Sequence, residues 1–364
     1  MKIFFFIDCL TSGGKERRLV ELMKGLKIIP EIQFELVLMS KDIHYTEVHD
    51  IGITIHYIIR KTKKDISAFS KFYKLCKIFE PDFIHCWDSM TAVVSLPICK
   101  ILQIKLVNGM VTDTPMKRNI LYKPWLRARL TFPFSDIIIG NSKAGLKAYS
   151  APKRKSYVIY NGFNFSRVVG LLDKNVVSDQ IGLRTKYVVG MVAAFGEFKD
   201  YKTYFDAAQL LLKKRSDVTF LAIGSDTDST QSKSYIENEN VANFILLGKQ
   251  SGIESYINAM DVCVLSTYSE GVSNSILEYM ALEKPVVVSA GGGSDEIVVN
   301  ETTGFLISPS NSIELCDKID LLLSDQQLRQ RMGLAGKERI KNHFSIEKMV
   351  DSYVDIYTRF LYTK

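Results

Sequence analysis

Short apolar runs alternate with longer amphipathic stretches along the chain. Residues 3–7 form an uninterrupted apolar run, which is typical of a strand buried on both faces of a parallel sheet. After a Gly13-Gly14 turn, apolar residues recur at helical spacing over residues 18–26. Continued to residue 160, the alternation predicts strands at residues 34–39, 54–58, 82–85, 105–107, 136–139 and 157–160, and helices at residues 67–79 and 91–102.

The rhythm breaks between residues 161 and 186, which lack a strong apolar period and are predicted to form a linker. A second series predicts strands at residues 187–193, 218–223, 243–247, 262–265 and 286–289, helices at residues 201–212 and 274–282, and three C-terminal helices. Buried strands that alternate with helices indicate parallel, doubly wound sheets. We therefore predict an α/β protein of two Rossmann-like domains, at residues 1–165 and 166–344, with residues 345–364 returning to the first domain.

The charge of the chain is unevenly distributed. Residues 1–165 contain 26 Lys and Arg against 14 Asp and Glu, whereas the remaining residues contain 21 against 26. A basic first half favours an anionic partner, and both a membrane surface and a nucleic acid would fit. We discount nucleic acid because no zinc-finger, RNA-recognition or helix-turn-helix signature is present. A basic solvated face without a partner is an equally good interpretation.

Cysteine usage and the apolar runs bear on the compartment. The six cysteines form no Cys-x-x-Cys pair and most lie in apolar runs, as expected for reduced core residues. Asp8 interrupts the apolar start too early for a signal peptide. No run approaches the roughly 20 apolar residues that span a bilayer. We expect a cytoplasmic protein that can lie peripherally on the inner face of the membrane.

Residues 116–130 mix basic, aromatic and aliphatic side chains, a composition typical of interfacial segments. One hypothesis is that this segment docks on anionic lipid beside a lipid-linked acceptor. The alternative is a helix that packs on the first domain and has a basic outer face.

The strongest candidate chemistry is a pair of carboxylates, Glu270 and Glu278, eight residues apart. The preceding strand places Glu270 in a strand-to-helix loop, and the helix should begin near Ser273. The first backbone N–H groups of a helix lack internal partners and carry the positive end of its dipole, so a diphosphate could bind there without a metal. About one turn further, the carboxylate of Glu278 could accept two vicinal hydroxyls, as on a ribose. Alternatively, Glu270 only caps the helix and Glu278 is a surface charge.

Several other segments of the chain contain recognisable sequence motifs. In the second half they are residues 269–281, 285–288, 291–293, 296–298 and 304–307, and elsewhere they are residues 13–16, 134–136, 141–142, 158–162 and 344–345. On these segments the chain resembles glycosyltransferase family 4, the glycosyl transferases of group 1. The resemblance implies the GT-B fold, in which the carboxyl ends of the strands of two Rossmann-like domains line a cleft, and retaining chemistry. We expect no cofactor, because the nucleotide sugar is a substrate and a helix end can hold its diphosphate without a metal.

The resemblance also implies roles for individual residues. Glu270 would bind donor-sugar hydroxyls near the reacting carbon, Glu278 would bind the ribose, and Lys199 would neutralise charge on the leaving nucleotide. A surface lysine at a helix start is the alternative for Lys199, although the helix dipole disfavours it. The other implied donor contacts are the diphosphate loop Gly271, Val272, Ser273, Asn274 and Ser275, the close approach at Gly13 and Gly14, and Leu247 near the nucleobase.

Two positions depart from the family pattern. Many members have a histidine where this chain has Asn108. The resemblance places Asn108 with Glu270 and Lys199 among the catalytic residues, where it could hydrogen-bond a sugar or phosphate but could not act as a general base. The arginine that often precedes the lysine is absent, because residues 192–195 read Val-Ala-Ala-Phe. His85 ends a predicted strand and could contact the acceptor, or only cap the strand. The Asp226-Thr227-Asp228 sequence matches a metal-binding Asp-x-Asp, but a helix-dipole donor site makes a metal unnecessary.

We therefore predict a retaining, metal-independent transferase that moves a hexose or N-acetylhexosamine from a nucleotide sugar, with UDP favoured. The acceptor is expected to be a saccharide, lipid-linked, in surface polysaccharide biosynthesis. The alternatives are a nucleotide-sugar epimerase of GT-B fold and a catalytically degenerate nucleotide-binding scaffold.

Overall fold

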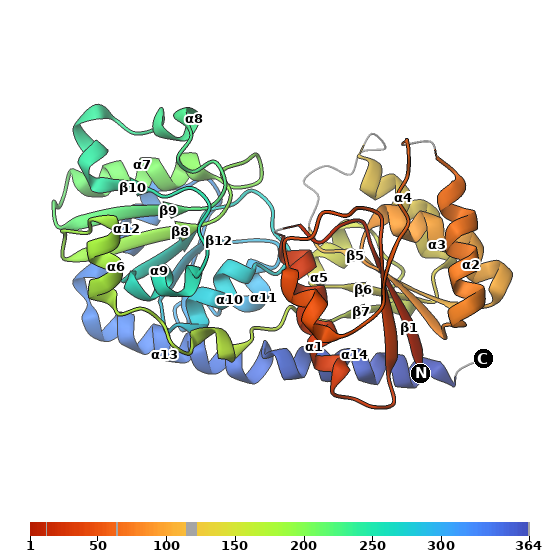
Figure 1. Cartoon of the computed structure of the whole chain (residues 1–364). Coiled ribbons are helices and arrows are strands. Elements are labelled where there is room, and N and C mark those ends of the chain that lie inside the picture. Colours follow the sequence, from red (N-terminus) through yellow and green to blue (C-terminus); the bar gives the residue numbers. More distant parts are fainter. Residues whose placement is uncertain (12, 63–64, 114–121, 363–364) are drawn as a thin grey trace. The chain divides into compact units, whose positions relative to one another are not determined.

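The computed structural model describes residues 1–11, 13–62, 65–113 and 122–362, which form two compact units (Figure 1). Unit 1 comprises Met1–Gly162 and Ile346–Lys364, and unit 2 comprises Phe163–Ser345. Each unit contains one parallel β-sheet with helices packed against it. The α/β fold with two Rossmann-like units is therefore the predicted one.

Unit 1 has a seven-stranded sheet in the order β3-β2-β1-β4-β5-β6-β7. All neighbouring strands are parallel, so their carboxyl ends lie at one edge of the sheet. The strands are β1 (Lys2–Ile7), β2 (Gln33–Leu38), β3 (Ile55–Tyr57), β4 (Phe83–Cys86), β5 (Lys105–Val111), β6 (Ile137–Gly140) and β7 (Ser156–Val158). The helices are α1 (Gly14–Lys27), α2 (Ser67–Phe79), α3 (Ser89–Leu102), α4 (Lys123–Thr131), α5 (Lys143–Ala148) and α14 (Ile346–Leu361), with 3-10 turns η1 (Thr46–Ile51), η2 (Phe132–Phe134) and η3 (Lys153–Lys155).

The central strand β1 is buried on both faces, as its apolar run predicts. Phe5 packs in a cluster with side chains of α1 and α14, whereas Phe4 and Phe6 pack in a second cluster with side chains of α2 and α3. Because successive side chains of a strand point to opposite faces, three consecutive phenylalanines can all be fully buried.

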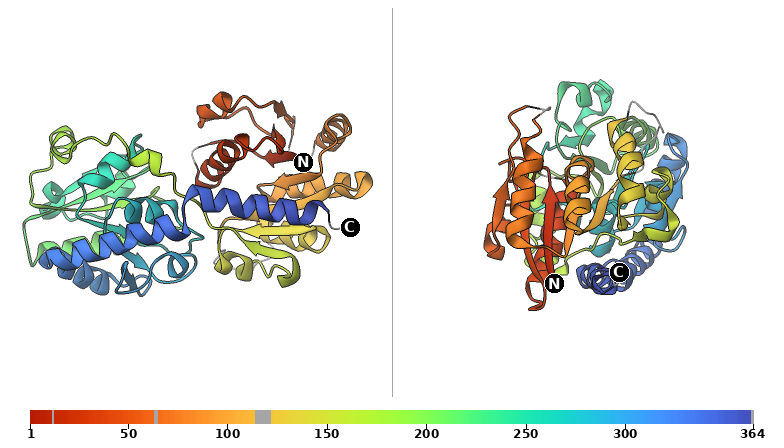
Figure 2. Two further views of the ribbon diagram at one scale, coloured as in Figure 1. Left: turned by 90° about the horizontal axis from the view of Figure 1, so that it is seen from below. Right: turned by 90° about the vertical axis from the view of Figure 1, so that its right-hand side faces the viewer.

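The last helix, α14, packs on unit 1 beside α1, as predicted for residues 345–364 (Figure 2). Its Tyr353 hydroxyl contacts the buried guanidinium of Arg18, which also donates to the Ile159 carbonyl at 2.9 Å. The rings of Trp87 and Tyr353 lie 5.3 and 5.4 Å from this guanidinium. Burial lowers the pKa of Arg18, and these hydrogen bonds and aromatic contacts compensate for its desolvation.

Unit 2 has a six-stranded parallel sheet in the order β10-β9-β8-β11-β12-β13. The strands are β8 (Tyr187–Val192), β9 (Val218–Ile223), β10 (Phe244–Leu246), β11 (Val262–Leu265), β12 (Val286–Ser289) and β13 (Gly304–Ile307). The helices are α6 (Lys174–Ile181), α7 (Tyr201–Leu212), α8 (Thr230–Lys233), α9 (Ile253–Ala259), α10 (Asn274–Ala281), α11 (Ser294–Ile297), α12 (Ser312–Ser324) and α13 (Gln326–His343), with 3-10 turns η4 (Phe165–Val168) and η5 (Asn238–Asn243).

Several elements differ from the predicted ones, and the short helices α5, α8, α9 and α11 were not predicted. The predicted linker contains α6, which the apolar pattern did not reveal because Val177 is its only buried residue. The strand β13 was not predicted as a strand, although its sequence was one of the family segments. The strand β5 continues to Val111, four residues beyond its predicted end.

None of the six cysteines is in a disulfide, and all except Cys9 are buried. In the described part of the chain, every helix is too short or too polar to cross a bilayer.

Candidate functional site

The loops at the carboxyl edge of the unit 2 sheet form a continuous hydrogen-bonded layer. Neighbouring loops are joined by backbone hydrogen bonds in the order of the strands. These bonds run from Gly224 N to Gly248 O (2.8 Å), Phe195 N to Ser225 O (2.8 Å), Asp200 N to Ser266 O (3.0 Å) and Gly293 N to Glu270 O (3.0 Å). Ligands of open α/β sheets bind at this edge, and the predicted donor residues of the second half all lie in or beside these loops.

Helix α10 begins at Asn274, with Ser273 as its N-cap, so its first turn points its N–H groups toward this edge. The Ser273 hydroxyl makes no capping hydrogen bond. Two side chains attach the helix to the end of β8: the Ser275 hydroxyl donates to the Val192 carbonyl (2.7 Å), and the Tyr279 hydroxyl accepts from the Val192 N–H (2.6 Å). The position of this helix end, which suits a diphosphate, is therefore fixed by the sheet.

The loop that carries Glu270 rests on the glycine-rich loop after β12. The backbone N–H of Gly293 donates to the Glu270 carbonyl, and a Cβ at Gly293 would collide with the backbone of Gly271 and Val272. The absence of a side chain at residue 293 is thus what allows the two loops to touch. The backbone position of Glu270 depends on this contact.

The side chains of Lys199 and Glu270 form an ion pair. Lys199 is held in place by its loop, since the Thr267 hydroxyl donates to the Phe198 carbonyl at 2.7 Å. Burial lowers the pKa of Lys199 to about 8, because burial disfavours the charged form. The structure therefore brings together two of the three residues predicted to be catalytic.

Glu278 lies on α10 and is only 4% exposed, so it is not the surface charge of the alternative interpretation. The guanidinium of Arg167 lies 2.8 Å from its carboxylate and also contacts the carboxylate of Glu254. Neither Arg167 nor Glu254 was predicted from the sequence. Arg167 lies in the supposed linker, 111 residues from Glu278, where no periodicity or motif indicated it.

The loop after β10, which contains Leu247, is tied to the loop after β9. Leu247 donates its N–H to the Ala222 carbonyl (3.0 Å), and Gly248 donates its N–H to the Thr227 hydroxyl (3.0 Å). Gly248 has a φ of +64°, and a Cβ there would meet the carboxylate of Asp228. The Asp-x-Asp sequence thus lies beside the predicted nucleobase position.

In unit 1, Gly13 and Gly14 form the N-terminus of α1, just beyond the carboxyl end of β1. The Tyr45 hydroxyl donates to the Gly13 carbonyl at 3.1 Å. A Cβ at Gly13 would meet the carboxylate of Glu16, so this side chain would have to move aside in a substituted protein.

A charged cluster that the sequence analysis missed lies next to this turn. The Lys15 ammonium lies 3.0 Å from Asp8 and 3.4 Å from Glu16, and Asp88 accepts the Asp8 N–H at 2.8 Å. Burial alone would lower the pKa of Lys15, but the carboxylates of Asp88, Asp8 and Glu16 together raise it. Burial and the charge of Asp8 raise the pKa of Asp88. The sequence contained an indication of this cluster, because Asp8 and Asp88 each follow a buried strand.

Within the described residues, one group of three potential metal ligands lies close together, namely Asp8, Cys9 and Glu16. The Lys15 ammonium already pairs with both carboxylates of this group. A fixed lysine in that position supplies the positive charge that a cation would bring.

The side chains of His85 on β4 and Asn108 on β5 are both buried inside unit 1. His85 is fully buried beneath α14, with its Nδ1 atom 2.6 Å from the Tyr357 hydroxyl, and burial lowers its pKa well below the usual value. Asn108 is also fully buried, and its amide donates to the hydroxyls of Thr131 (3.1 Å) and Ser135 (3.2 Å). Neither side chain is exposed in this structure, and a contact of His85 or Asn108 with the substrate stays a prediction.

Of residues 116–130, residues 116–121 lie outside the described part of the chain. The described part contains α4, which buries Ala128 and Thr131 against unit 1. Leu126 and Leu130 are exposed by 39% and 57%, and the Arg129 guanidinium lies 5.5 Å from the Trp125 ring. The helix is therefore packed on unit 1, and its exposed side carries both leucines and the basic residues Lys123 and Arg129.

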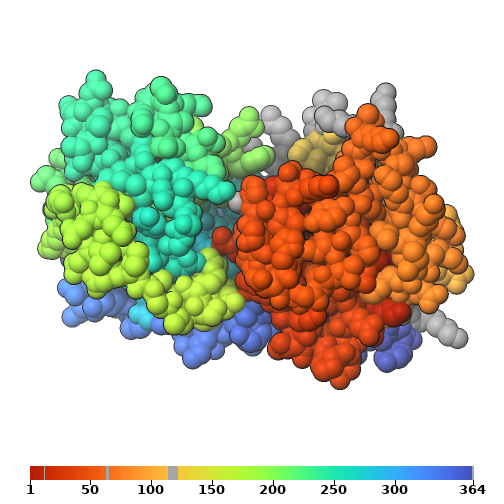
Figure 3. Space-filling model, viewed as in Figure 1, coloured from red at the N-terminus to blue at the C-terminus, as the bar shows by residue number. Residues whose placement is uncertain are grey.

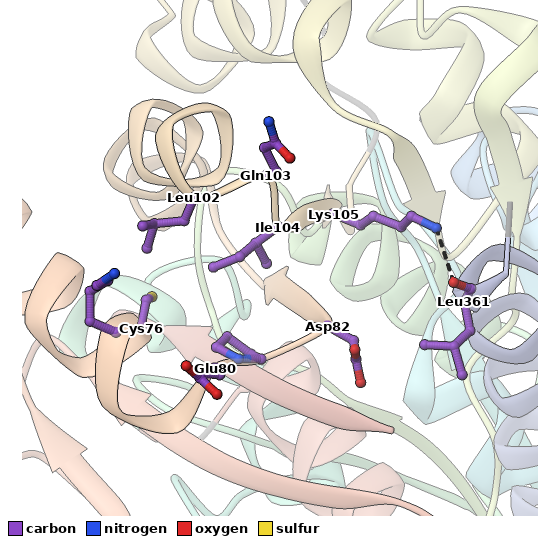
Figure 4. A pocket seen from close by; sticks show the side chains of 10 residues that line it. Cys76, Glu80, Asp82, Leu102, Gln103, Ile104, Lys105 and Leu361 are labelled. Atoms are coloured by element: carbon purple, nitrogen blue, oxygen red, sulfur yellow. Dashed lines mark hydrogen bonds between the residues drawn. The ribbon is translucent and has the colours of Figure 1, made fainter. Parts of the chain in front are cut away.

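A hollow of about 380 Å³ lies at the opposite, amino edge of the unit 1 sheet (Figure 4). Asp82 and Lys105, at the starts of β4 and β5, line it together with Leu361. The Lys105 ammonium contacts the carbonyls of Phe360 and Leu361, so it caps the last turn of α14. None of the predicted site residues lines this hollow.

Two parallel-sheet units, with a helix N-terminus and a carboxylate-lysine pair at the carboxyl edge of the second, are the arrangement expected of a glycosyltransferase of GT-B fold. Residues 12–167 match the family model described as Glycosyltransferase Family 4, and residues 173–339 match the model described as Glycosyl transferases group 1. The chain therefore belongs to the family 4 glycosyltransferases, and it is a glycosyltransferase.

The chain is similar over almost its whole length to two curated bacterial proteins. It is 25% identical to the capsular polysaccharide biosynthesis glycosyltransferase CapM of Staphylococcus aureus, covering 95% of this chain and 98% of that protein. It is also 25% identical to an Escherichia coli UDP-Gal:alpha-D-GlcNAc-diphosphoundecaprenol alpha-1,3-galactosyltransferase, covering 96% and 94% of the two chains. The fold is similar to that of HepE of Anabaena in complex with UDP and glucose, with a TM-score of 0.86, 20% identity and coverage of 98% and 99%.

Proposed function

We propose that this chain is a retaining, metal-independent glycosyltransferase that takes a hexose or N-acetylhexosamine from a UDP-sugar. One observation carries the proposal: the Lys199–Glu270 pair, the N-terminus of α10 and the buried carboxylate of Glu278 share the carboxyl edge of one sheet. UDP is favoured because the E. coli relative is named for a UDP-sugar and HepE was solved with UDP.

In the proposed reaction, an acceptor hydroxyl attacks the anomeric carbon of the sugar while the bond from that carbon to the diphosphate breaks. The leaving diphosphate gains negative charge, which the α10 N-terminus and the Lys199 ammonium would stabilise. The Glu270 carboxylate would exchange its pairing with Lys199 for hydroxyls of the donor sugar. A donor phosphate oxygen would take the proton of the acceptor hydroxyl, so a retaining transfer needs no base from the protein.

The acceptor is proposed to be a saccharide on a lipid diphosphate, used in the biosynthesis of a surface polysaccharide. Both curated relatives support this, since one is named for capsular polysaccharide and the other for a diphosphoundecaprenol acceptor. Unit 1 would bind this acceptor, and its basic composition suits a diphosphate.

We further propose that unit 1 binds peripherally to anionic lipid through α4. Exposed Leu126 and Leu130 lie one helical turn apart, and Lys123 and Arg129 add positive charge to the same short helix. Binding to vesicles that contain anionic lipid at low ionic strength tests this part separately from the transfer reaction.

A donor panel tests the proposed reaction. The protein is incubated with UDP-, GDP- and ADP-sugars, and both thermal stabilisation and the fate of each donor are measured. Transfer or slow hydrolysis of a UDP-sugar supports the proposal. Conversion of the donor to an epimer would instead support an epimerase, and binding without any turnover would support a scaffold.

A further inference from the structure

Arg167 connects two carboxylates of unit 2 that come from different helices. Its Nη2 atom lies 2.8 Å from the Oε1 atom of Glu278 on α10 and also contacts the Oε1 atom of Glu254 on α9. Both carboxylate residues are buried, at 4% and 9% exposure. A buried carboxylate is costly unless it is paired, so Arg167 compensates for two such groups at once.

The guanidinium of Arg167 is itself held from two sides. It lies 5.3 Å from the ring of Phe163, a buried residue whose backbone N–H donates to the Phe344 carbonyl at 2.7 Å. On its other side it contacts Glu254 in the first turn of α9. The turn η4 that carries Arg167 and the helix α6 run over the surface of unit 2, coloured yellow-green in Figure 3.

We propose that Arg167 is a positioning residue of the donor site, which sets the direction of the Glu278 carboxylate toward the donor ribose. Glu254 and the Phe163 ring orient Arg167, and Arg167 orients Glu278. The inference rests on the proposed function, because it assumes that Glu278 binds ribose hydroxyls.

The chemistry of Arg167 and the two glutamates supports the proposal that Arg167 orients Glu278. A guanidinium is planar and its N–H groups have fixed directions, so one nitrogen can donate to both carboxylates only in a defined geometry. A glutamate side chain has several rotatable bonds, and fixing them before the donor binds removes an entropic cost from binding. Arg167 and Glu254 therefore hold the Glu278 carboxylate in its ribose-binding orientation before the donor binds.

The test is the Arg167→Met variant, which keeps the aliphatic stem and removes the guanidinium. Its kcat and KM are measured with the UDP-sugar and with the corresponding 2′-deoxy- and 3′-deoxyuridine donors. We expect the donor KM to rise roughly 10- to 100-fold, as for the loss of a charge-assisted hydrogen bond, with a smaller change in kcat. The preference of the wild type for the ribose donor over the deoxy donors should shrink in the same variant.

Arg184→Met is the matched control, because Arg184 is an exposed arginine of unit 2 that lies 3.5 Å from the carboxylate of Asp179. It should keep both the donor KM and the ribose preference. Glu254→Gln is the second variant and preserves the side-chain volume. If Arg167→Met fails to fold, a reduced ribose preference in Glu254→Gln still supports the proposal, and an unchanged preference overturns it.

The outcomes separate this inference from the proposed function. If Glu278→Gln loses the ribose preference but Arg167→Met keeps it, Arg167 has only a structural role and the inference fails. Tighter donor binding by Arg167→Met would also overturn it, because Arg167 would then compete with the ribose. If the wild type itself does not distinguish ribose from deoxyribose, the ribose role of Glu278 in the proposed function is what fails.

Discussion

The Gly293→Ala substitution would place one methyl group between the two loops that support Glu270. The added Cβ would lie 2.6 Å from the Val272 nitrogen and closer still to the Gly271 carbonyl. Optimal contacts of such atoms are about 3.5–4.0 Å, so the Glu270 loop would have to move by about 1 Å. The opposing atoms belong to the backbone, so no change of side-chain rotamer can relieve the collision.

A displacement of about 1 Å near the reacting atoms can lower the rate by about 100-fold, and we expect kcat/KM to fall by that factor. Overpacking of this kind also lowers the free energy of unfolding by about 1–3 kcal/mol, which leaves the protein folded at assay temperature. Initial rates of sugar transfer give kcat/KM, and thermal unfolding shows whether the variant is folded.

Gly336→Ala is the matched control. Its Cβ would meet the Met280 side chain at 3.4 Å, an ordinary contact, and residue 336 lies in the interior of α13. Alanine is favoured over glycine in a helix by up to about 1 kcal/mol, so this variant should be active and at least as stable as the wild type. Wild-type kcat/KM in a folded Gly293→Ala protein would refute the claim that Gly293 positions the Glu270 loop.

Two further predictions concern charge. Lys199 must be protonated to stabilise the leaving diphosphate, and its pKa is lowered to about 8, so kcat/KM should be constant below this pH and fall as the pH rises through it. In Lys199→Arg the basic limb should move to higher pH because a guanidinium stays charged, and a wild-type profile that is flat to high pH would contradict the assignment. A Leu126→Glu/Leu130→Glu double variant should lose flotation with anionic vesicles at low salt, while its turnover of a water-soluble acceptor persists. Flotation equal to that of the wild type would exclude α4 as the contact.

The parts of the fold that could be predicted are those in which local pattern and tertiary role agree. The buried run at Phe4–Phe6 is apolar because both faces of β1 are covered, so the sequence alone indicates the strand. Helix α6 could not be found in this way, because it buries only Val177 and most of its surface faces solvent. A helix that buries one side chain has no apolar period to detect.

The residues of the candidate site likewise include some that a local pattern predicts and others that it does not. Glu270, Glu278 and the start of α10 follow from a strand-to-helix pattern within a few residues. The burial of His85 and Asn108 could not be predicted from the local pattern. Tyr357 of α14 covers His85, and β5 extends beyond Asn108 to Val111. The pairing of Arg167 with Glu254 and Glu278 likewise joins segments far apart in the sequence, so only the folded chain reveals it.

The central claim is that Glu270, in the loop between β11 and α10, acts on a nucleotide-sugar donor. The most direct measurement is transfer of labelled sugar from a UDP-sugar to a lipid diphosphate-linked saccharide by the wild type and by Glu270→Ala. The wild type should form the product, and the folded Glu270→Ala variant should lose at least about 100- to 1000-fold in kcat, the size of effect seen when one transition-state contact is removed. Full transfer activity in folded Glu270→Ala would contradict the account.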